Sequence, residues 1–206
     1  LGNFSDFDVT KDLRPISQMS ELDRFILHRL HHVVKRSLNS YDKYEFHTIY
    51  HTLHNFCVVD LSSFYLDIIK DRLYTALPDS VERKAAQTVL YDILSGMLCI
   101  MAPVMNFTAA EAWEHLPSAG GDEQRKAHEV FLQEFPAENA EAIDSELDRK
   151  WKRFLEVRSE ITKALEGARR DKVIGHPLEA KVMVKATGSL AEFLADKWDT
   201  LKMISI

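Results

Sequence analysis

Apolar residues recur at the spacing of an α-helix over most of this chain, and that period limits the fold more than any other feature. It runs through residues 20–38, 44–73, 80–101 and 143–165. A period of 3.6 residues gathers the apolar side chains on one side of each helix, where neighbouring helices can cover them. The pattern therefore predicts a mainly α fold built as a helical bundle. In residues 44–73 the pattern places six residues on the buried side of the helix: Phe46, Ile49, Tyr50, Leu53, Phe56 and Cys57.

Several helix ends carry recognisable signals. Ser20 followed by Asp23 has the spacing of a capping box, and Ser80 is predicted to cap the third long helix. Pro103 is predicted to end or bend that helix, since proline cannot donate the backbone hydrogen bond of a helix interior. These signals place long helices from about residues 21 and 81.

Two further signals concern helix starts inside or after these stretches. Around Asp60 the apolar pattern changes phase, which predicts either a kink or a new helix capped by Asp60. Thr108 with Glu111 resembles a second capping box, which predicts a short helix through Trp113. At helical core spacing, Trp113 and Trp151 are predicted to be buried.

The period changes after Pro177. Residues 178–187 alternate between apolar and polar side chains, which predicts a half-buried strand. Residues 190–198 follow as a predicted helix and residues 201–206 as a second predicted strand. We therefore expect a small, truncated β-α-β unit at 177–206 after a helical domain at 1–176. The chain also lacks an initiator methionine, and we expect it to be part of a longer protein.

Charge is distributed unevenly along the chain. The net charge is −6, but residues 91–150 carry 4 basic against 12 acidic side chains and residues 151–206 carry 11 against 8. The deficit lies in the middle, and local potential matters more to a bound phosphate than the total. Composition thus excludes a strong basic patch and allows a modest RNA footprint.

No catalytic constellation is found, and histidine is the one candidate metal ligand that recurs. His47, His51 and His54 share one helix face, as do His28 and His32. Two such ladders could form a zinc site, but no carboxylate stands at ligand spacing. A solvent-facing or RNA-facing helix side is the favoured interpretation. Two cysteines outside any C-x-x-C pair, Cys57 and Cys99, are typical of reduced core thiols in a cytoplasmic protein, and no segment is long and apolar enough to span a membrane.

Residues 60–74, DLSSFYLDIIKDRLY, closely resemble the stretch D-L-S-x-F-Y-L-D-I-x-K-D-R-L-Y of bacterial-type isoleucyl-tRNA synthetases. Three more blocks agree in order: LGNFSDFD at 1–8, APVMNFTAAEAW at 102–113, and WKRFLEVR at 151–158 with LEAKV at 178–182. The chain is similar to the anticodon-binding region of that family plus the start of its C-terminal junction domain. The resemblance implies a class I synthetase helical bundle and a non-catalytic role in holding the anticodon stem-loop of isoleucine tRNA. It places ATP-Mg, zinc and the catalytic and C-terminal domains elsewhere in the parent ligase, with no cofactor in these residues.

RNA binding of this kind needs cations for phosphates and flat groups for unstacked bases. The block at 60–74 supplies two cations, and the last long helix supplies four that helical spacing places within about one face. The candidates for phosphate contact are therefore Lys70, Arg72, Arg158, Lys163, Arg169 and Lys172. Two other interpretations stay open: a helical protein-interaction module without an RNA role, and the equivalent domain of a valyl- or leucyl-tRNA synthetase.

Overall fold

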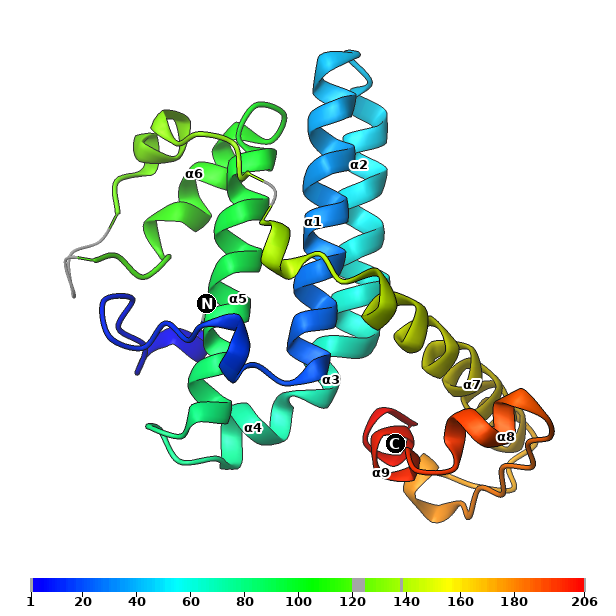
Figure 1. Cartoon of the computed structure of the whole chain (residues 1–206). Coiled ribbons are helices and arrows are strands. Elements are labelled where there is room, and N and C mark those ends of the chain that lie inside the picture. The colour runs from blue at the N-terminus through cyan, green and yellow to red at the C-terminus, as the bar shows by residue number, and fades with distance from the viewer. Residues whose placement is uncertain (1, 120–124, 138, 206) are drawn as a thin grey trace. The chain divides into compact units, whose positions relative to one another are not determined.

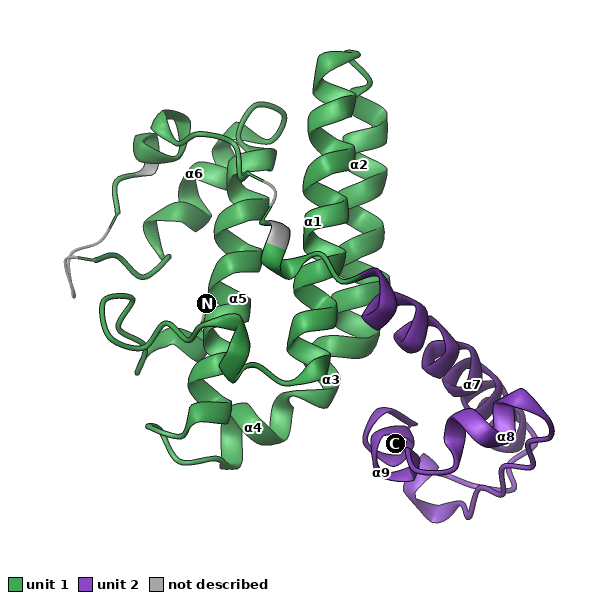
Figure 2. Cartoon of the chain, in the orientation of Figure 1, with its two compact units in different colours: residues 1–144 green, residues 145–206 purple. Residues whose placement is uncertain are grey.

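The computed structural model describes residues 2–119, 125–137 and 139–205, and nearly all of its regular structure is helical. Apart from an isolated bridge at Ser118, these residues contain no β-strand. Contacts divide the chain into two compact units, residues 1–144 (unit 1) and 145–206 (unit 2), which Figure 2 colours separately. The predicted helical bundle is confirmed. None of the described helices is long and apolar enough to cross a membrane.

The frame of unit 1 is three long helical elements. Helix α1 (Glu21–Asp42) and helix α2 (Phe46–Asn55) form a hairpin, and α5 (Val81–Met101) packs against α1, as Figure 1 shows. The capping box predicted for Ser20 and Asp23 is present, and Ser80 caps α5 as predicted. Both caps satisfy backbone N–H groups that a helix start leaves unpaired.

The change of phase at Asp60 is caused neither by a kink nor by a new helix capped by Asp60, the two causes predicted from the sequence. Residues Phe56–Tyr65 form a π-helix (η3), which continues α2 and leads into α3 (Leu66–Ile68) and α4 (Lys70–Thr75). A π-helix bonds each N–H to the carbonyl five residues back and so rotates the buried face. Asp60 lies inside this continuous helical backbone and caps nothing. Its carboxylate instead accepts two hydrogen bonds from Arg29 of α1, at 2.9 and 3.2 Å.

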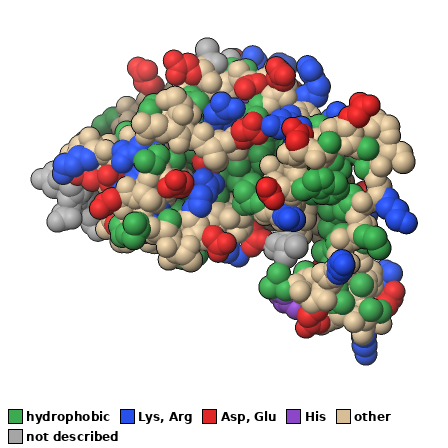
Figure 3. Space-filling model, turned by 60° about the horizontal axis from the view of Figure 1, so that its bottom comes forward, with side chains coloured by type: hydrophobic (Ala, Val, Ile, Leu, Met, Phe, Trp, Pro, Cys, Tyr) green, Lys and Arg blue, Asp and Glu red, His purple; other side chains and the backbone are tan. Residues whose placement is uncertain are grey.

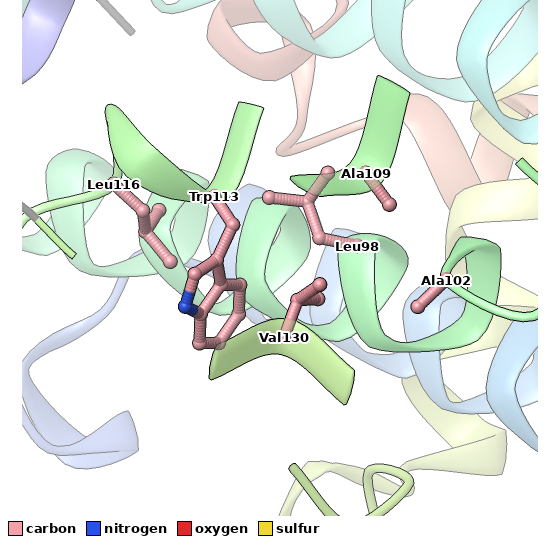
Figure 4. Packing of buried hydrophobic residues seen from close by; sticks show 6 residues of the cluster. All are labelled: Leu98, Ala102, Ala109, Trp113, Leu116 and Val130. Carbon is pink, nitrogen blue, oxygen red and sulfur yellow. The ribbon is translucent and has the colours of Figure 1, made fainter. Parts of the chain in front are cut away.

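Shorter elements complete unit 1. They are η1 (Gly2–Phe4), η2 (Ile16–Gln18), α6 (Asn106–Glu114), η4 (Ala127–Leu132) and η5 (Ala140–Ala142). The predicted capping box at Thr108 is wrong, since α6 begins two residues earlier without a side-chain cap and Asn106 accepts a hydrogen bond from the Phe107 N–H. Trp113 of α6 is buried in the cluster drawn in Figure 4, with residues from α6 and the segments around it: Leu98, Ala102, Ala109, Leu116 and Val130.

The N-terminal segment is held on α5 by polar contacts between distant residues. The Gln87 amide donates to the Asn3 carbonyl and to the Asp6 carboxylate, both at 2.7 Å. Arg83 pairs with the same Asp6 at 3.0 Å. Lys84, which is 2% exposed, pairs with Asp12 at 2.8 Å. The block LGNFSDFD therefore contributes to the fold of unit 1 through these bonds.

Unit 2 consists of α7 (Ser145–Arg170), η6 (Pro177–Glu179), α8 (Ser189–Leu194) and α9 (Trp198–Ser205). The apolar side of α7 is buried as predicted at Leu147, Trp151, Phe154, Ile161 and Leu165. The ring of Phe193 from α8 lies 4.8 Å from that of Phe154 between centroids, and α9 also contacts α7. Because α7 packs with the segments that follow it, the compact unit begins at residue 145, whereas the sequence placed a boundary after 176.

The predicted β-α-β unit is wrong. Residues 181–187 have no regular structure. Val182 and Met183, which the predicted strand would have placed on its buried and exposed sides, are both exposed. The expected second strand is helix α9, which buries Leu201 and Ile204, three residues apart. Residue 206, the last of that expected strand, lies outside the described residues. Without a neighbouring strand to bond, a short apolar segment buries more surface as a helix on α7.

Candidate nucleic-acid interface

Two of the predicted RNA-contacting cations, Lys70 and Arg72, stand at the start of α4 and have opposite environments. The Lys70 ammonium pairs with Asp67 at 2.7 Å, and both side chains are more than half exposed. The Arg72 guanidinium donates to both carboxylate oxygens of Asp23, at 2.7 and 2.8 Å. Asp23 is fully buried. Lys70 is thus accessible to a partner, whereas the hydrogen bonds of Arg72 are directed into the protein.

Asp23 is the centre of a network that joins α1 to the segment 60–74. Besides Arg72, its carboxylate accepts a 2.8 Å hydrogen bond from the Tyr65 hydroxyl and caps α1 through Ser20. Burial raises the pKa of Tyr65 well above its ordinary value, and the negative charge of Asp23 adds to this. Burial alone would lower the pKa of Arg72, but bonding to Asp23 outweighs it and raises that pKa. Much of the characteristic 60–74 block therefore holds the bundle together.

The four predicted cations of the last long helix lie in unit 2. Lys163 and Arg169 are exposed and pair with Glu160 and Glu166, one turn earlier in α7. Arg158 is half-buried, and its Nε donates to the carbonyl of Ile204 in α9.

Lys172 lies beyond the end of α7, so the expected single helical face does not include it. Its φ is 58°, its N–H bonds to the Arg169 carbonyl and the next N–H, of Val173, bonds to Ala168. These two bonds form a Schellman motif that closes the helix. The side chain of Lys172 is exposed. Lys163, Arg169 and Lys172 thus present their charges to solvent.

A surface on α2 that the sequence interpretation assigned in part to the core is exposed. We call it the α2 aromatic face, and it comprises Phe46, His47, Tyr50, His51 and His54. Phe46 is 48% exposed and Tyr50 57% exposed, so their predicted burial is wrong. The Tyr50 ring stacks on His54 with centroids 5.7 Å apart and meets the edge of His51 at 5.3 Å. Adjacent aromatic rings on an exposed helix can receive unstacked bases.

This face is also unusual in charge. From residue 46 to residue 66 the only formally charged residue is Asp60, which is buried and bonded to Arg29. A long exposed helix side without carboxylates does not repel a phosphate chain. The absence of Asp, Glu, Lys and Arg from the exposed positions was the sequence signal for this surface, because exposed helix faces normally carry charges.

The other histidine pair is internal. His28 is 1% exposed; its Nδ1 accepts the Asp144 N–H at 3.0 Å, and its Nε2 lies 3.0 Å from Nε2 of His32. Since Nδ1 accepts, the ring proton of a neutral His28 lies on Nε2 and can be donated to His32. The prediction of a solvent- or RNA-facing side is therefore wrong for His28. Among the residues that the structure describes, no three His, Cys, Asp or Glu side chains form a group that could hold a metal ion.

Residues 23–184 match the family model described as the anticodon-binding domain of tRNA ligase. The chain belongs to this family. It is 52% identical over 206 residues to the isoleucine–tRNA ligase of Desulfotalea psychrophila, covering all of this chain and 22% of that protein. It is 48% identical over 194 residues, 94% of the chain, to that of Desulforamulus reducens, covering 20% of it. It is also 45% identical over its full length to that of Natranaerobius thermophilus, covering 22% of it.

The chain spans about a fifth of the length of these curated relatives. The resemblance seen in the sequence to the anticodon-binding region of isoleucyl-tRNA synthetases is thus confirmed along the whole chain. Within this anticodon-binding domain, charge does not gather on the face shown in Figure 3, where Lys and Arg side chains alternate with Asp and Glu. This face therefore has no large basic patch that could attract RNA by its charge alone.

Proposed function

We propose that the chain binds the anticodon stem-loop of isoleucine tRNA as the anticodon-binding region of an isoleucine–tRNA ligase. The observation that carries the proposal is the family match over residues 23–184 together with full-length similarity to isoleucine–tRNA ligases. In this proposal the parent enzyme attaches isoleucine to tRNA with ATP-Mg, and its zinc and catalytic residues lie in other domains. The role of this region is non-catalytic, and the parent acts in the cytoplasm.

The contacts that support RNA binding are of two kinds. The α2 aromatic face offers Tyr50 and His54 as a stacked pair for unstacked bases. Exposed cations offer phosphate contacts, with Lys70 in unit 1 and Lys163, Arg169 and Lys172 in unit 2. Arg72 and Arg158 are assigned a positioning role instead, because their guanidinium groups are bonded to Asp23 and to the Ile204 carbonyl.

The test of the RNA role is a titration of the 206-residue chain with the anticodon stem-loop at several salt concentrations. Binding is expected to weaken as salt rises, with a slope that reports the few phosphates contacted. Lys70→Ala should reduce that slope by about one and cost about 1 kcal/mol of binding. Lys11→Ala is the matched control, since Lys11 is also exposed and pairs with an aspartate three residues away.

Unit 2 has its own matched pair. Lys163 and Lys202 both lie on helices, are exposed and pair with an acidic residue three positions earlier. Lys163→Ala is expected to lower affinity and Lys202→Ala to leave it unchanged. Equal effects in both pairs would assign the salt dependence to overall charge and reject the proposed contacts.

Base stacking is tested on α2. The double variant Tyr50→Ala, His54→Ala should lose about 1–3 kcal/mol of stem-loop binding, the range for one stacked base. Phe107→Ala is the control, because Phe107 is 85% exposed on α6 and outside the α2 aromatic face. The same variants in the complete ligase should lower the rate of isoleucine tRNA charging. A chain with no salt-dependent RNA binding would instead be a protein-interaction module.

A further inference from the structure

A groove runs between α1 and the continuous segment that α2 and η3 form; Figure 1 shows α1 and α2 side by side. We call it the hairpin groove. Its volume is about 220 Å³, room for about seven water molecules at about 30 Å³ each. That is below the range of about 300–1,000 Å³ for pockets that hold drug-sized ligands, and it suits a small group. Polar side chains supply most of its lining: Arg29, His32, Arg36, Thr52, Asn55 and Asp60.

The one carboxylate in this lining is already paired. Asp60 is buried, and its two oxygens accept hydrogen bonds from Nε and Nη2 of Arg29 at 2.9 and 3.2 Å. A guanidinium has more N–H groups than these two bonds use, so Arg29 keeps donors for another acceptor. Asp60 therefore holds Arg29 in place and leaves no net negative charge in the groove.

Arg36 gives the groove its net positive charge. Its side chain is exposed, and no carboxylate of the described residues pairs with it. The positions three and four residues away on α1 are His32, Val33, Asn39 and Ser40, so an ion pair along the helix cannot form. The facing segment has no Asp or Glu from residue 46 to residue 59. An arginine in such surroundings can offer its planar pair of N–H donors to a phosphate.

His32 contributes a donor because hydrogen bonds fix its tautomer. Nδ1 of His28 accepts the Asp144 N–H at 3.0 Å, so a neutral His28 has its proton on Nε2. That proton is donated to Nε2 of His32, 3.0 Å away, and a neutral His32 therefore has its own proton on Nδ1. Since His32 is exposed and lines the groove, this N–H is available to a ligand.

The opposite wall adds neutral polar groups. Asn55 is exposed, and its amide nitrogen has two N–H donors. The Thr52 Oγ1 is buried and has no hydrogen-bond partner in the described part of the chain. A buried polar atom left in that state calls for an explanation such as a bound group. Both walls thus carry donors, which suits a ligand rich in acceptor oxygens.

The hairpin groove adjoins the α2 aromatic face. Asn55 follows His51 by four residues, and side chains at that spacing are neighbours on a helix. The His51 ring in turn meets the ring of Tyr50, with centroids 5.3 Å apart. A nucleotide carries its phosphate one sugar away from its base. One short stretch of RNA can therefore reach both surfaces.

We propose that the hairpin groove binds a backbone phosphate of an RNA chain beside a base stacked on the α2 aromatic face. Arg36 donates to the phosphate oxygens and supplies the charge, while His32 and Asn55 donate from the two walls. The inference rests on the proposed function, because it assigns a phosphate site to the RNA bound there. Arg36 was not among the cations predicted from the sequence.

Arg36→Gln tests the site in a titration of the 206-residue chain with the anticodon stem-loop. It should weaken binding about tenfold and reduce the salt slope by about one, because one charged contact is lost. Lys35→Gln is the matched control, since Lys35 is the preceding residue of α1, is exposed and does not line the groove. Equal losses in the two variants would assign the effect to overall charge and overturn the proposal.

Asn55→Ala tests the other wall with a neutral residue. It should lower the affinity and leave the salt slope unchanged, because an amide contact releases no counterion. Urea unfolding of each variant checks the fold, and both positions are exposed, with glutamine and alanine favouring a helix. An affinity that stays the same in Asn55→Ala and in Arg36→Gln would reject the groove as a site.

A change in the RNA locates the contact. Each phosphodiester of the loop is replaced in turn by an uncharged methylphosphonate. At one linkage this replacement should weaken binding to the unsubstituted chain about tenfold and have no effect on Arg36→Gln, which already lacks the contact. With Lys35→Gln the replacement should have its full effect. Losses that add at every linkage would overturn the proposal.

The outcomes separate this inference from the proposed function. If the unsubstituted chain does not bind the stem-loop, both are rejected. If it binds and Arg36→Gln binds equally well, the groove alone is rejected. Inorganic phosphate, compared with chloride at equal ionic strength, tests a free anion as the ligand. Displacement of RNA by millimolar phosphate without coupling between Arg36 and any linkage would overturn the assignment to an RNA backbone.

Discussion

In unit 1, Arg72 reaches a fully buried Asp23 that lies 49 residues away in sequence, whereas in unit 2 Lys163 pairs with Glu160 within one turn of the same helix. Unit 1 also has local exposed pairs, Lys11 with Asp8 and Lys70 with Asp67, but its pairs that involve buried or partly buried carboxylates include several between distant segments. Arg29 to Asp60, Arg83 to Asp6 and Lys84 to Asp12 join distant segments of unit 1. The pairs of Lys152, Arg169 and Lys202 join residues three or four apart in unit 2.

These ion pairs show that charged side chains have two roles in this domain, one in tertiary structure and one at the surface. A buried pair between distant segments fixes tertiary structure, and removing one partner leaves an uncompensated buried charge. An exposed pair within a helix contributes little, so its cation can change partner at small cost. Cations of the second kind are those that can release a neighbouring carboxylate and bind a phosphate. The residue type alone does not say which use applies.

The largest effect that this comparison predicts is on Arg72. Arg72→Ala should lower the free energy of unfolding by about 3–5 kcal/mol, because Asp23 stays buried without its partner. Urea unfolding at neutral pH, followed by circular dichroism, measures it.

Lys70→Ala is the matched control for that loss. Lys70 is two residues away, pairs with an exposed Asp67 and should change stability by less than about 0.5 kcal/mol. Lys163→Ala in unit 2 should behave the same way. Similar losses in Arg72→Ala and Lys70→Ala would remove the distinction between the two kinds of ion pair.

Asp92 gives the next largest effect, because burial shifts its pKa and no ion pair with the described residues offsets that burial. Its pKa is raised from 3.8 to about 6 by burial. The folded state therefore keeps the proton that the unfolded state loses between these values, and stability from this group is present below pH 3.8 and lost as pH rises through 6.

Asp92→Asn removes that loss, since an amide does not ionise. The difference in unfolding free energy between Asp92→Asn and the unsubstituted protein should grow in favour of the variant by about 1–3 kcal/mol from pH 4 to pH 7. Urea unfolding of both proteins at a series of pH values measures it. A difference that does not vary with pH would mean that the carboxylate is solvated or paired in solution.

Features set by neighbouring residues were predictable from the sequence. The capping box at Ser20 and Asp23, the cap at Ser80 and the end of α5 before Pro103 all depend on residues within four positions. The long amphipathic helices were equally accessible, because burial on one side follows from their period.

Apart from the capping box at Thr108, most of what failed depended on distant partners. The sequence gives Arg72 and Lys70 the same appearance, and only the fold shows that Asp23 lies beside Arg72. The apolar run at 201–206 fits a strand or a helix, and its packing on α7 decides for helix α9. Tyr50 was assigned to the core because its spacing fits the apolar period. Of that predicted face, α2 buries Ile49 and Leu53 in its hairpin with α1 and leaves Tyr50 exposed.

The smallest effect concerns the end of α7, where unit 2 uses a residue that local geometry disfavours. Lys172 closes the helix with φ at 58°, a conformation that glycine adopts without the penalty of a Cβ. Lys172→Gly should raise the free energy of unfolding by about 0.5 kcal/mol, the strain relieved being partly offset by the greater freedom of glycine in the unfolded chain. The same change at Lys163, in the interior of α7, should instead cost about 1 kcal/mol. Urea unfolding in a Trp113→Phe background measures both changes, because Trp151 and Trp198 of unit 2 then provide the fluorescence signal. Opposite signs for the same substitution at the two positions identify the Schellman closure.

The two variants also separate stability from RNA binding, because both remove a cation proposed to contact phosphate. Both should weaken stem-loop binding although only one destabilises the helix, and a Lys172→Gly protein that binds as well as the unsubstituted chain would exclude Lys172 from the interface.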